Sequence, residues 1–177
     1  AVGICAATVS EAEGLVRAGV RGVLVTGPVA TSGKAERLVN LLRLDHDLMV
    51  VIDSHEGLEL LARAGREAGQ RMDVLLDVDV VLHRTGVSPA AAPELAAAIA
   101  ACEAVRLRGI QAYAGHLQHV GAYEERRRLS LECLQDAVSA FRTLRDRYPD
   151  CTVFSTSGTG TFDIDLAVPE ITELQPG

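Results

Sequence analysis

Apolar and polar positions along the chain follow a repeating order: a short, nearly continuous apolar run, then a longer stretch with helical periodicity. Apolar runs of this kind, flanked by helices, are typical of parallel strands that are buried on both faces. Seven such runs predict strands over 2–8, 22–28, 47–53, 73–80, 109–117, 151–157 and 170–177. The intervening periodicity predicts helices over 10–19, 32–43, 55–69, 88–104 and 124–148.

Local signals support individual helices. Ser10 is followed three residues later by Glu13, the spacing of a capping box at a helix N-terminus. Pro89 suits the first turn of the Ala-rich helix because a first-turn residue needs no N–H partner. The longest helix carries one apolar stripe, formed by Leu134, Ala137, Val138, Phe141 and Leu144.

Two α/β architectures fit alternating strands and helices, an open doubly wound sheet and a (β/α)₈ barrel. An open sheet gathers its polar site at one switch point, whereas every strand of a barrel ends at one mouth. Polar residues follow nearly every predicted strand: Thr8, Thr26, Asp53, Asp79, His83, Arg84, His116, Ser155, Ser157 and Gln175. We therefore predict a TIM barrel that is incomplete, with about strands 2 to 8 in a single domain over 1–177, truncated at both ends.

Composition narrows the class of protein. The chain has 177 residues, 48% of them hydrophobic, and a net charge of −7, which argues against disorder and against a general basic surface for nucleic acid. No apolar run approaches the roughly 18 residues that span a membrane. The chain has no initiator Met and no signal-like start. We expect a cytoplasmic protein with no nucleic-acid and no membrane partner.

The four cysteines are Cys5, Cys102, Cys133 and Cys151, and none belongs to a C-x-x-C pair. Each lies among apolar neighbours, so we expect buried free thiols in a reducing cytoplasm. A zinc site would need closer ligand spacing.

Lysine is nearly absent: Lys34 stands against sixteen arginines. The stretch "GPVATSGK" (27–34) approaches a phosphate-binding P-loop. The motif requires four residues between its glycines and a hydroxyl after the lysine. Five residues separate Gly27 from Gly33 here, and Ala35 follows the lysine. We therefore reject a P-loop and expect Lys34 to be exposed in a first helical turn.

Two polar segments follow predicted strands. "DVDVVLHRTGV" (77–87) is either a solvated loop or a site where the guanidinium of Arg84 meets an anionic oxygen. In "GIQAYAGHLQHV" (109–120), strand alternation would turn His116 into the barrel mouth if Ala112 and Ala114 face the interior. Metal binding by His116 and His119 would need a helix there and is disfavoured.

The loop "STSGTGTFDID" (155–165) is small, rich in Gly, Ser and Thr, and follows an apolar run. Such a loop is a plain turn or an anion site, since glycines let backbone N–H groups approach an anion closely. If one strand is missing upstream, the loop follows strand 7, where barrels commonly bind phosphate. The position favours a phosphate site.

Five segments together resemble the D-threonine aldolase and D-serine dehydratase-like family of fold-type III pyridoxal phosphate enzymes, whose barrel is of the alanine racemase type. They are "GICAATVSEAEGLVRAG", "DVDVVLHRTGV", "GIQAYAGHLQH", "SGTGTFDID" and "TELQPG", and they occur in order over essentially the whole chain. The resemblance implies pyridoxal 5'-phosphate as the cofactor.

The resemblance also implies roles for individual residues. The Gly/Thr loop of Ser157, Gly158, Thr159, Gly160 and Thr161 would bind the phosphate, with a backbone donor added by Gly177. Gln175 takes the place of the arginine that faces the pyridine nitrogen in alanine racemases. Arg84 would lie near the phenolic oxygen, and His116 would pack against the ring. The chain departs from relatives at Val81, where they often have glycine, and in the hydroxyl residues of "STSGTGT".

By the same resemblance, the Schiff-base lysine is expected upstream of Ala1, at the end of the missing first strand, so no catalytic residue is assigned within the chain. A divalent metal (Mn or Zn) is expected in a missing C-terminal β-domain, so no metal ligand is assigned either. The fragment alone is expected to be inactive, and the full-length protein to be a homodimer.

The activity implied for the full-length protein is that of a lyase acting on small-molecule D-amino acids. Retro-aldol cleavage of D-β-hydroxy amino acids to glycine and an aldehyde is favoured. The alternatives are β-elimination to a keto acid and ammonia, as in D-serine dehydratase, and a non-catalytic barrel that binds the cofactor. An unrelated barrel that binds a sugar phosphate or flavin phosphate through Ser157–Thr161 is a further alternative.

Overall fold

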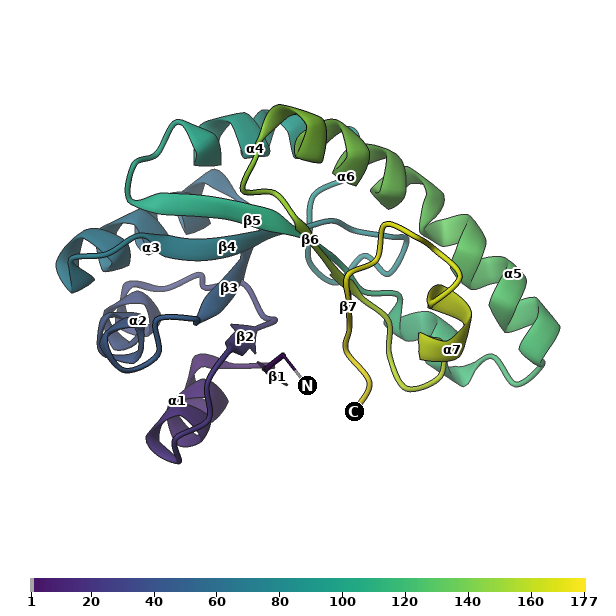
Figure 1. The fold of residues 1–177 in the computed structure, drawn as a ribbon, viewed down its shortest axis with the longest axis horizontal. Helices are drawn as coiled ribbons and strands as arrows, with labels where there is room; N and C mark the ends of the chain where they lie inside the picture. Colours follow the sequence, from purple (N-terminus) through teal and green to yellow (C-terminus); the bar gives the residue numbers. More distant parts are fainter. Residues whose placement is uncertain (1) are drawn as a thin grey trace. The chain divides into compact units, whose positions relative to one another are not determined.

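The computed structural model describes residues 2–177. Its strands are β1 (Ile4–Ala6), β2 (Val23–Val25), β3 (Met49–Ile52), β4 (Met72–Asp77), β5 (Val105–Ala112), β6 (Val153–Thr156) and β7 (Glu173–Leu174) (Figure 1). Its helices are α1 (Val9–Arg17), α2 (Ser32–Leu44), α3 (His55–Ala68), α4 (Ala92–Ala100), the 3₁₀ helix η1 (Gly115–His119), α5 (Tyr123–Cys133), α6 (Gln135–Arg147) and α7 (Phe162–Asp165).

The strands form one sheet in chain order, β1-β2-β3-β4-β5-β6-β7. The pairs β1–β2, β2–β3, β5–β6 and β6–β7 are parallel. A doubly wound sheet reverses its strand order at a switch point, whereas a barrel sheet runs on in chain order. The strand order is therefore that of a (β/α)₈ barrel.

The chain divides into two compact units. The first consists of the residues up to Leu75 together with Leu95–Leu107, and the second of Leu76–Glu94 together with Arg108–Gly177. Strands β4 and β5 contribute residues to both units.

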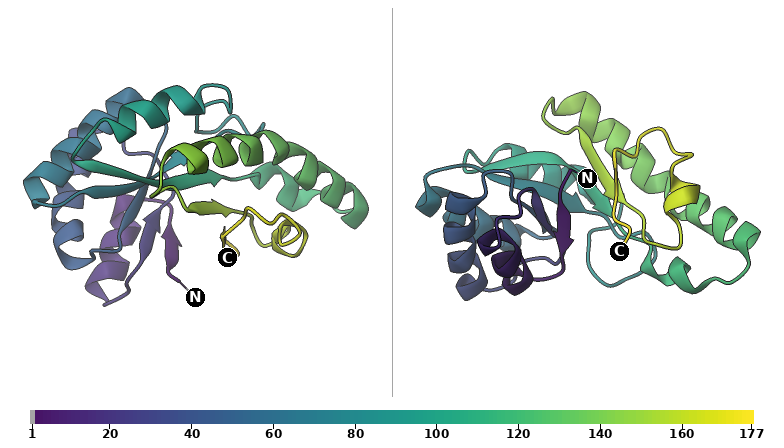
Figure 2. Two further views of the ribbon diagram at one scale, coloured as in Figure 1. Left: turned by 45° about the horizontal axis from the view of Figure 1, so that its top comes forward. Right: turned by 60° about the horizontal axis from the view of Figure 1, so that its bottom comes forward.

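In the first unit, α1, α2 and α3 lie on one side of their strands (Figures 1 and 2). Fully buried leucines of α2 and α3, among them Leu38, Leu42 and Leu61, supply core together with Val50 and Ile52 of β3. Burying one such side chain stabilises the fold by about 1.5–3 kcal/mol. Lys34 is exposed in the first turn of α2, as predicted.

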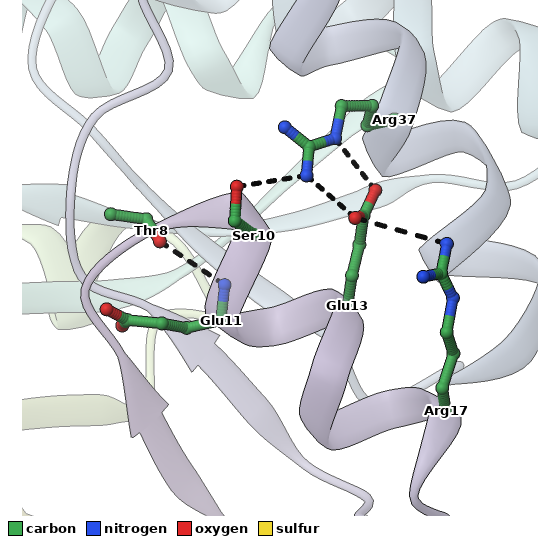
Figure 3. Close-up of polar contacts among 6 residues, drawn as sticks. All are labelled: Thr8, Ser10, Glu11, Glu13, Arg17 and Arg37. Atoms are coloured by element: carbon green, nitrogen blue, oxygen red, sulfur yellow. Dashed lines mark hydrogen bonds and ion pairs between the residues drawn. The ribbon is translucent and has the colours of Figure 1, made fainter.

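The predicted capping box at Ser10 is wrong by two residues. Thr8 is the N-cap of α1, and its Oγ1 accepts a hydrogen bond from Glu11 N at 3.3 Å (Figure 3). The Glu11 carboxylate accepts from Ala7 N at 2.7 Å. Thr8 and Glu11 have the same three-residue spacing as Ser10 and Glu13, so the sequence alone offered two registers.

Ser10 and Glu13 instead connect α1 to α2. The Arg37 guanidinium donates to both Glu13 carboxylate oxygens, at 2.8 and 2.7 Å, and to Ser10 Oγ at 3.0 Å (Figure 3). This forked contact lowers the pKa of Glu13 below its usual value.

In the second unit, the predicted helix over 124–148 is two helices. α5 ends at Cys133 and α6 begins at Gln135, with Leu134 between them. Phe141 of α6 packs against Phe154 of β6, with ring centroids 5.3 Å apart. Helix α7 lies beside α5 (Figure 2), where Ser130 Oγ donates to the buried Asp165 carboxylate at 2.6 Å.

Other predicted boundaries also shift. The helix predicted over 88–104 runs only over Ala92–Ala100, because Pro89 lies in a turn before it and Val105 already begins β5. The predicted strand over 109–117 ends at Ala112 and is followed by η1. Gly109 has φ +154°, and a Cβ there would lie 1.7 Å from the Val153 oxygen, so only glycine allows β6 to approach.

The prediction of four buried cysteines is confirmed for Cys151 and is wrong for Cys5. Cys151 is buried and Cys102 and Cys133 are half-buried, but Cys5 is exposed in β1. None of the four forms a disulfide within residues 2–177. Within residues 2–177, no helix is both long and apolar enough to span a membrane.

A candidate anion and ring site in the second unit

The loop after β6 carries a buried hydroxyl without a partner. Ser157 has φ +72° and is 2% exposed, and its Oγ makes no hydrogen bond within residues 2–177. A buried polar atom that lacks a partner costs free energy, so such atoms are rare in folded proteins. A left-handed serine with an orphaned hydroxyl indicates a position kept for binding.

Gln118 of η1 holds this loop. Its Oε1 accepts a hydrogen bond from Gly160 N at 2.6 Å, and its Nε2 donates to Thr161 Oγ1 at 3.4 Å. A Cβ on Gly158 would lie 2.7 Å from the Gln118 amide, and one on Gly160 would lie 3.0 Å from its Oε1. The two glycines are therefore required where the Gln118 side chain crosses the loop.

The end of the chain lies against the same loop. Thr159 Oγ1 donates to Gly177 O at 2.8 Å, and Gly177 N donates back to Thr159 Oγ1 at 3.0 Å. Gly158 N likewise donates to Thr161 Oγ1 at 3.3 Å. The structure brings the predicted residues 157–161 and Gly177 together, with several of their N–H groups bonded within the cluster.

Gln175 lies in a hydrogen-bonded chain of side chains. Its Nε2 donates to Gln111 Oε1 at 3.2 Å and to Ser155 Oγ at 2.9 Å. Gln111 Nε2 donates in turn to Asp77 Oδ1 at 3.0 Å, and Thr85 Oγ1 donates to Asp77 Oδ2 at 2.7 Å. Asp77, Gln111 and Ser155 are each at most 3% exposed. A buried network of hydrogen-bonded polar side chains favours a single arrangement of those side chains.

The register of β5 and β6 explains this polar face. Gln111 pairs with Ser155, and Ala112 with Thr156. Thr156 is on the same side of β6 as Phe154, which faces helix α6 through Phe141. Ala112 therefore faces the helix layer and Gln111 the opposite, inner side. The condition under which alternation would turn His116 into the mouth is not met, because the interior position is held by a glutamine rather than an alanine.

His116 lies on η1 and is exposed. Alternation does not extend to it, since β5 ends four residues earlier. Arg84 is also exposed, and its guanidinium carbon lies 5.4 Å from the centre of the Tyr113 ring. Such a contact is a cation–π interaction, which holds the guanidinium beside the ring.

The segment before Arg84 is strained. Val81 and His83 have φ values of +74° and +53°. The Asp79 carboxylate accepts from His83 N at 2.9 Å and lies 2.6 Å from His83 Nδ1, which stabilises the turn. Val87 pairs with Val78 at its base.

The inner face contains a carboxyl group with a shifted pKa. Burial raises the pKa of Glu173, partly offset by a hydrogen bond from Ser155 and by the charge of Arg108. Within residues 2–177, no group of three His, Cys, Asp or Glu side chains is arranged to hold a metal ion.

Sequence reasoning missed Asp77, Gln111 and Gln118 as site residues. Gln111 is polar within an otherwise apolar strand, which is a usable signal. Gln118 carried no comparable signal, because its contact depends on where η1 crosses a loop about 40 residues further along the chain.

Comparisons with known proteins agree with this geometry. Residues 1–177 match the family model "alanine racemase, N-terminal domain". The chain is 34% identical to a D-threonine aldolase from Arthrobacter sp over 176 residues, which is 99% of this chain and 46% of that protein. It is 30% identical over 177 residues to a 3-hydroxy-D-aspartate aldolase from Paracoccus denitrificans, again 99% of this chain and 46% of the relative.

A solved structure gives the same result. The crystal structure of D-threonine aldolase from Filomicrobium marinum matches with a TM-score of 0.94 and 34% identity, covering 100% of this chain and 48% of that one. The chain thus spans about half the length of the relatives it matches. The match confirms the predicted fold class, a partial barrel of alanine racemase type, and excludes an unrelated barrel. The chain belongs to the alanine racemase N-terminal domain family.

Proposed function

We propose that the complete protein is a pyridoxal 5'-phosphate-dependent lyase that cleaves D-β-hydroxy amino acids to glycine and an aldehyde. The proposal rests on one observation: a buried Ser157 hydroxyl without a hydrogen-bond partner lies in the same compact unit as the hydrogen-bonded polar side chains around Gln175. The D-threonine aldolases at 34% identity support the reaction class.

The residues present fit the cofactor. A phosphate accepts hydrogen bonds, and the buried Ser157 hydroxyl is a donor that lacks an acceptor. Gly158 and Gly160 add no side chain of their own, so the Gln118 amide can pack against the loop. An aromatic ring with a polar nitrogen suits Gln175, a neutral residue whose Nε2 is bonded to Gln111 and Ser155 and whose Oε1 remains for a ligand.

Each residue has a proposed role. Ser157–Thr161 and Gly177 would bind the phosphate, Arg84 would meet the phenolic oxygen, His116 would pack against the ring, and Gln175 would face the ring nitrogen. When bound, the cofactor supplies an electron sink for the bond that breaks in the substrate. The contribution of this chain is to position and orient that group and to exclude water around the inner face.

By the resemblance, the lysine that anchors the cofactor would come from the complete protein outside 1–177, and Lys34, exposed in the first turn of α2, is not at the matching position. A divalent metal (Mn or Zn), bound outside these residues, would hold the substrate's β-hydroxyl. We further propose a cytoplasmic location, which is supported by four cysteines that form no disulfide within residues 2–177, and a homodimer, which rests on the family resemblance alone.

Borohydride reduction of the complete protein with pyridoxal phosphate, followed by peptide mass mapping, tests the cofactor. We expect a pyridoxyl adduct on a lysine outside 1–177, and none on Lys34, which serves as the internal control. If no lysine carries an adduct, the assignment of pyridoxal phosphate as the cofactor is wrong. Ser157→Gly keeps the left-handed backbone accessible and removes the hydroxyl, so it should weaken cofactor binding about tenfold, whereas Ser139→Ala on α6 should not.

A dehydratase is the second candidate, favoured by a D-threo-3-hydroxyaspartate dehydratase from Delftia sp. HT23 that matches with a TM-score of 0.86 and 28% identity over 100% of this chain and 47% of that one. Incubation with D-threonine separates the two. Glycine and acetaldehyde in equal amounts support the aldolase, whereas ammonia and a keto acid support β-elimination. Cofactor binding without either product, across D-β-hydroxy amino acids, would favour a non-catalytic barrel.

A further inference from the structure

The direction of the Gln175 amide is determined by groups on the neighbouring strands. Asp77 is 3% exposed, and its carboxyl oxygens accept hydrogen bonds from Thr85 Oγ1 and from Gln111 Nε2. The amide nitrogen of Gln111 faces Asp77 Oδ1 at 3.0 Å, which leaves its Oε1 directed toward Gln175.

The next step follows in the same way. Gln111 Oε1 can only accept, so the group 3.2 Å from it must be the Nε2 of Gln175. The same nitrogen donates its second hydrogen to Ser155 Oγ at 2.9 Å. Both hydrogens of the Gln175 amide are thus used within the protein.

We propose that Gln175 offers the bound ligand only its Oε1, as an acceptor, and so selects a ligand group that donates a hydrogen bond. Oε1 has no hydrogen-bond partner within residues 2–177, and Gln175 is half-buried at the end of β7. A ligand atom that donates a hydrogen bond can pair with this oxygen. A ligand atom that only accepts would face another acceptor and is therefore disfavoured.

This inference rests on the proposed function for the identity of the ligand. If Gln175 faces the ring nitrogen of pyridoxal phosphate, that nitrogen must bear a proton. A neutral glutamine could otherwise rotate its amide to suit either form of the nitrogen. The Asp77–Gln111 relay removes this freedom, so Asp77 and Gln111 act as positioning residues.

The test is ¹⁵N NMR of the complete protein loaded with pyridoxal phosphate labelled at the ring nitrogen. We expect the chemical shift of a protonated pyridinium. In Gln175→Met, which removes the acceptor, the ratio of protonated to unprotonated nitrogen should fall about tenfold. Gln135→Met on the exposed start of α6 is the control and should leave the ratio unchanged.

The relay is tested by Gln111→Met, which disconnects Gln175 from Asp77 and should lower the protonated fraction while cofactor is still bound. An unprotonated nitrogen in the unmodified protein, or a ratio that Gln175→Met does not change, would overturn this inference alone. Borohydride reduction of the same sample separates this result from failure of the proposed function. A sample with no lysine adduct would overturn both.

Discussion

Gln118 Oε1 accepts the hydrogen bond of Gly160 N at 2.6 Å and so ties η1 to the loop after β6. Any substitution in this loop therefore acts on that contact as well. The glycines at 158 and 160 are needed first of all because the Gln118 side chain occupies the space that a Cβ would take.

The first prediction is that Gly158→Ala and Gln118→Ala are coupled. Gly158→Ala alone should weaken pyridoxal phosphate binding to the complete protein, because its Cβ would lie 2.7 Å from the Gln118 amide and displace it. In the double variant the space is restored, so the coupling should be about 0.5–3 kcal/mol in a double-mutant cycle measured by cofactor titration. Additive effects would mean that the two residues act separately.

How much could be predicted from the sequence depended on the kind of signal. Most strands were predicted in the right place because their apolar runs are nearly continuous, as in Met72–Asp77, whereas 170–177 is mostly polar and contains only the two-residue strand β7. The errors at residues 10–13 and 124–148 arose where the pattern allowed more than one answer. Two capping boxes are offset by two residues, and Leu134 fits an apolar stripe that runs through the break between α5 and α6.

The candidate site was predictable only in part, for a physical reason. Residues 157–161 and Gln175 could be singled out by local composition and resemblance. The partners that orient them are distant in sequence: Gln111 is 34 residues from Asp77 and 64 from Gln175, and Gln118 is 42 residues from Gly160. Such contacts depend on sheet register, which a single sequence does not specify.

The second prediction concerns the strained turn after β4. Val81 is 64% exposed and has φ +74°, a conformation that costs an L-residue about 1–2 kcal/mol. Val81→Gly should therefore stabilise the complete protein, by about 1 kcal/mol after the greater flexibility of glycine in the unfolded chain is subtracted. Urea denaturation measures this change in the free energy of unfolding. Val2→Gly is the control: it changes an exposed valine without a positive φ and should not stabilise the protein. A loss of stability in Val81→Gly would show that the backbone at Val81 is not strained.

The third prediction concerns the approach of β5 to β6. Gly109→Ala would place a Cβ 1.7 Å from the Val153 oxygen at φ +154°. The backbone cannot move that far without breaking the pairing of β5 and β6. The free energy of unfolding should therefore fall by more than about 4 kcal/mol, and little soluble protein should remain. Gly121→Ala is the matched control, because a Cβ added at Gly121 would meet no atom within 4 Å. If the Gly109→Ala protein is soluble and its melting temperature is unchanged, position 109 does not require glycine.

The fourth prediction concerns the ion pair between α1 and α2. The Arg37 guanidinium lowers the pKa of Glu13, so the folded state gains stability above the usual carboxyl pKa of 4.5 and loses it as the pH falls through the lowered value. Glu13→Gln should lower the melting temperature slightly at pH 7 and have no effect at pH values where Glu13 is protonated. Since the pair is partly exposed, high salt should reduce the difference. Glu124→Gln on α5 is the control, and an equal effect of both variants would show that the contact contributes nothing.

The last prediction is that Cys133 and Cys151 resist alkylation in the folded protein. Burial raises the pKa of Cys133 to about 12, helped by the charge of Asp165, and raises the pKa of Cys151 to about 11. At pH 8, roughly one thiol in a thousand or fewer is then a reactive thiolate. Iodoacetamide followed by peptide mapping should label neither cysteine within the time that labels both in urea. The same shifts make the folded state lose stability as the pH rises above about 9, because the thiols of the unfolded chain ionise first. Rapid labelling of Cys133 under native conditions would show that α5 and α7 separate near Asp165, which would also loosen the segment that follows the anion loop.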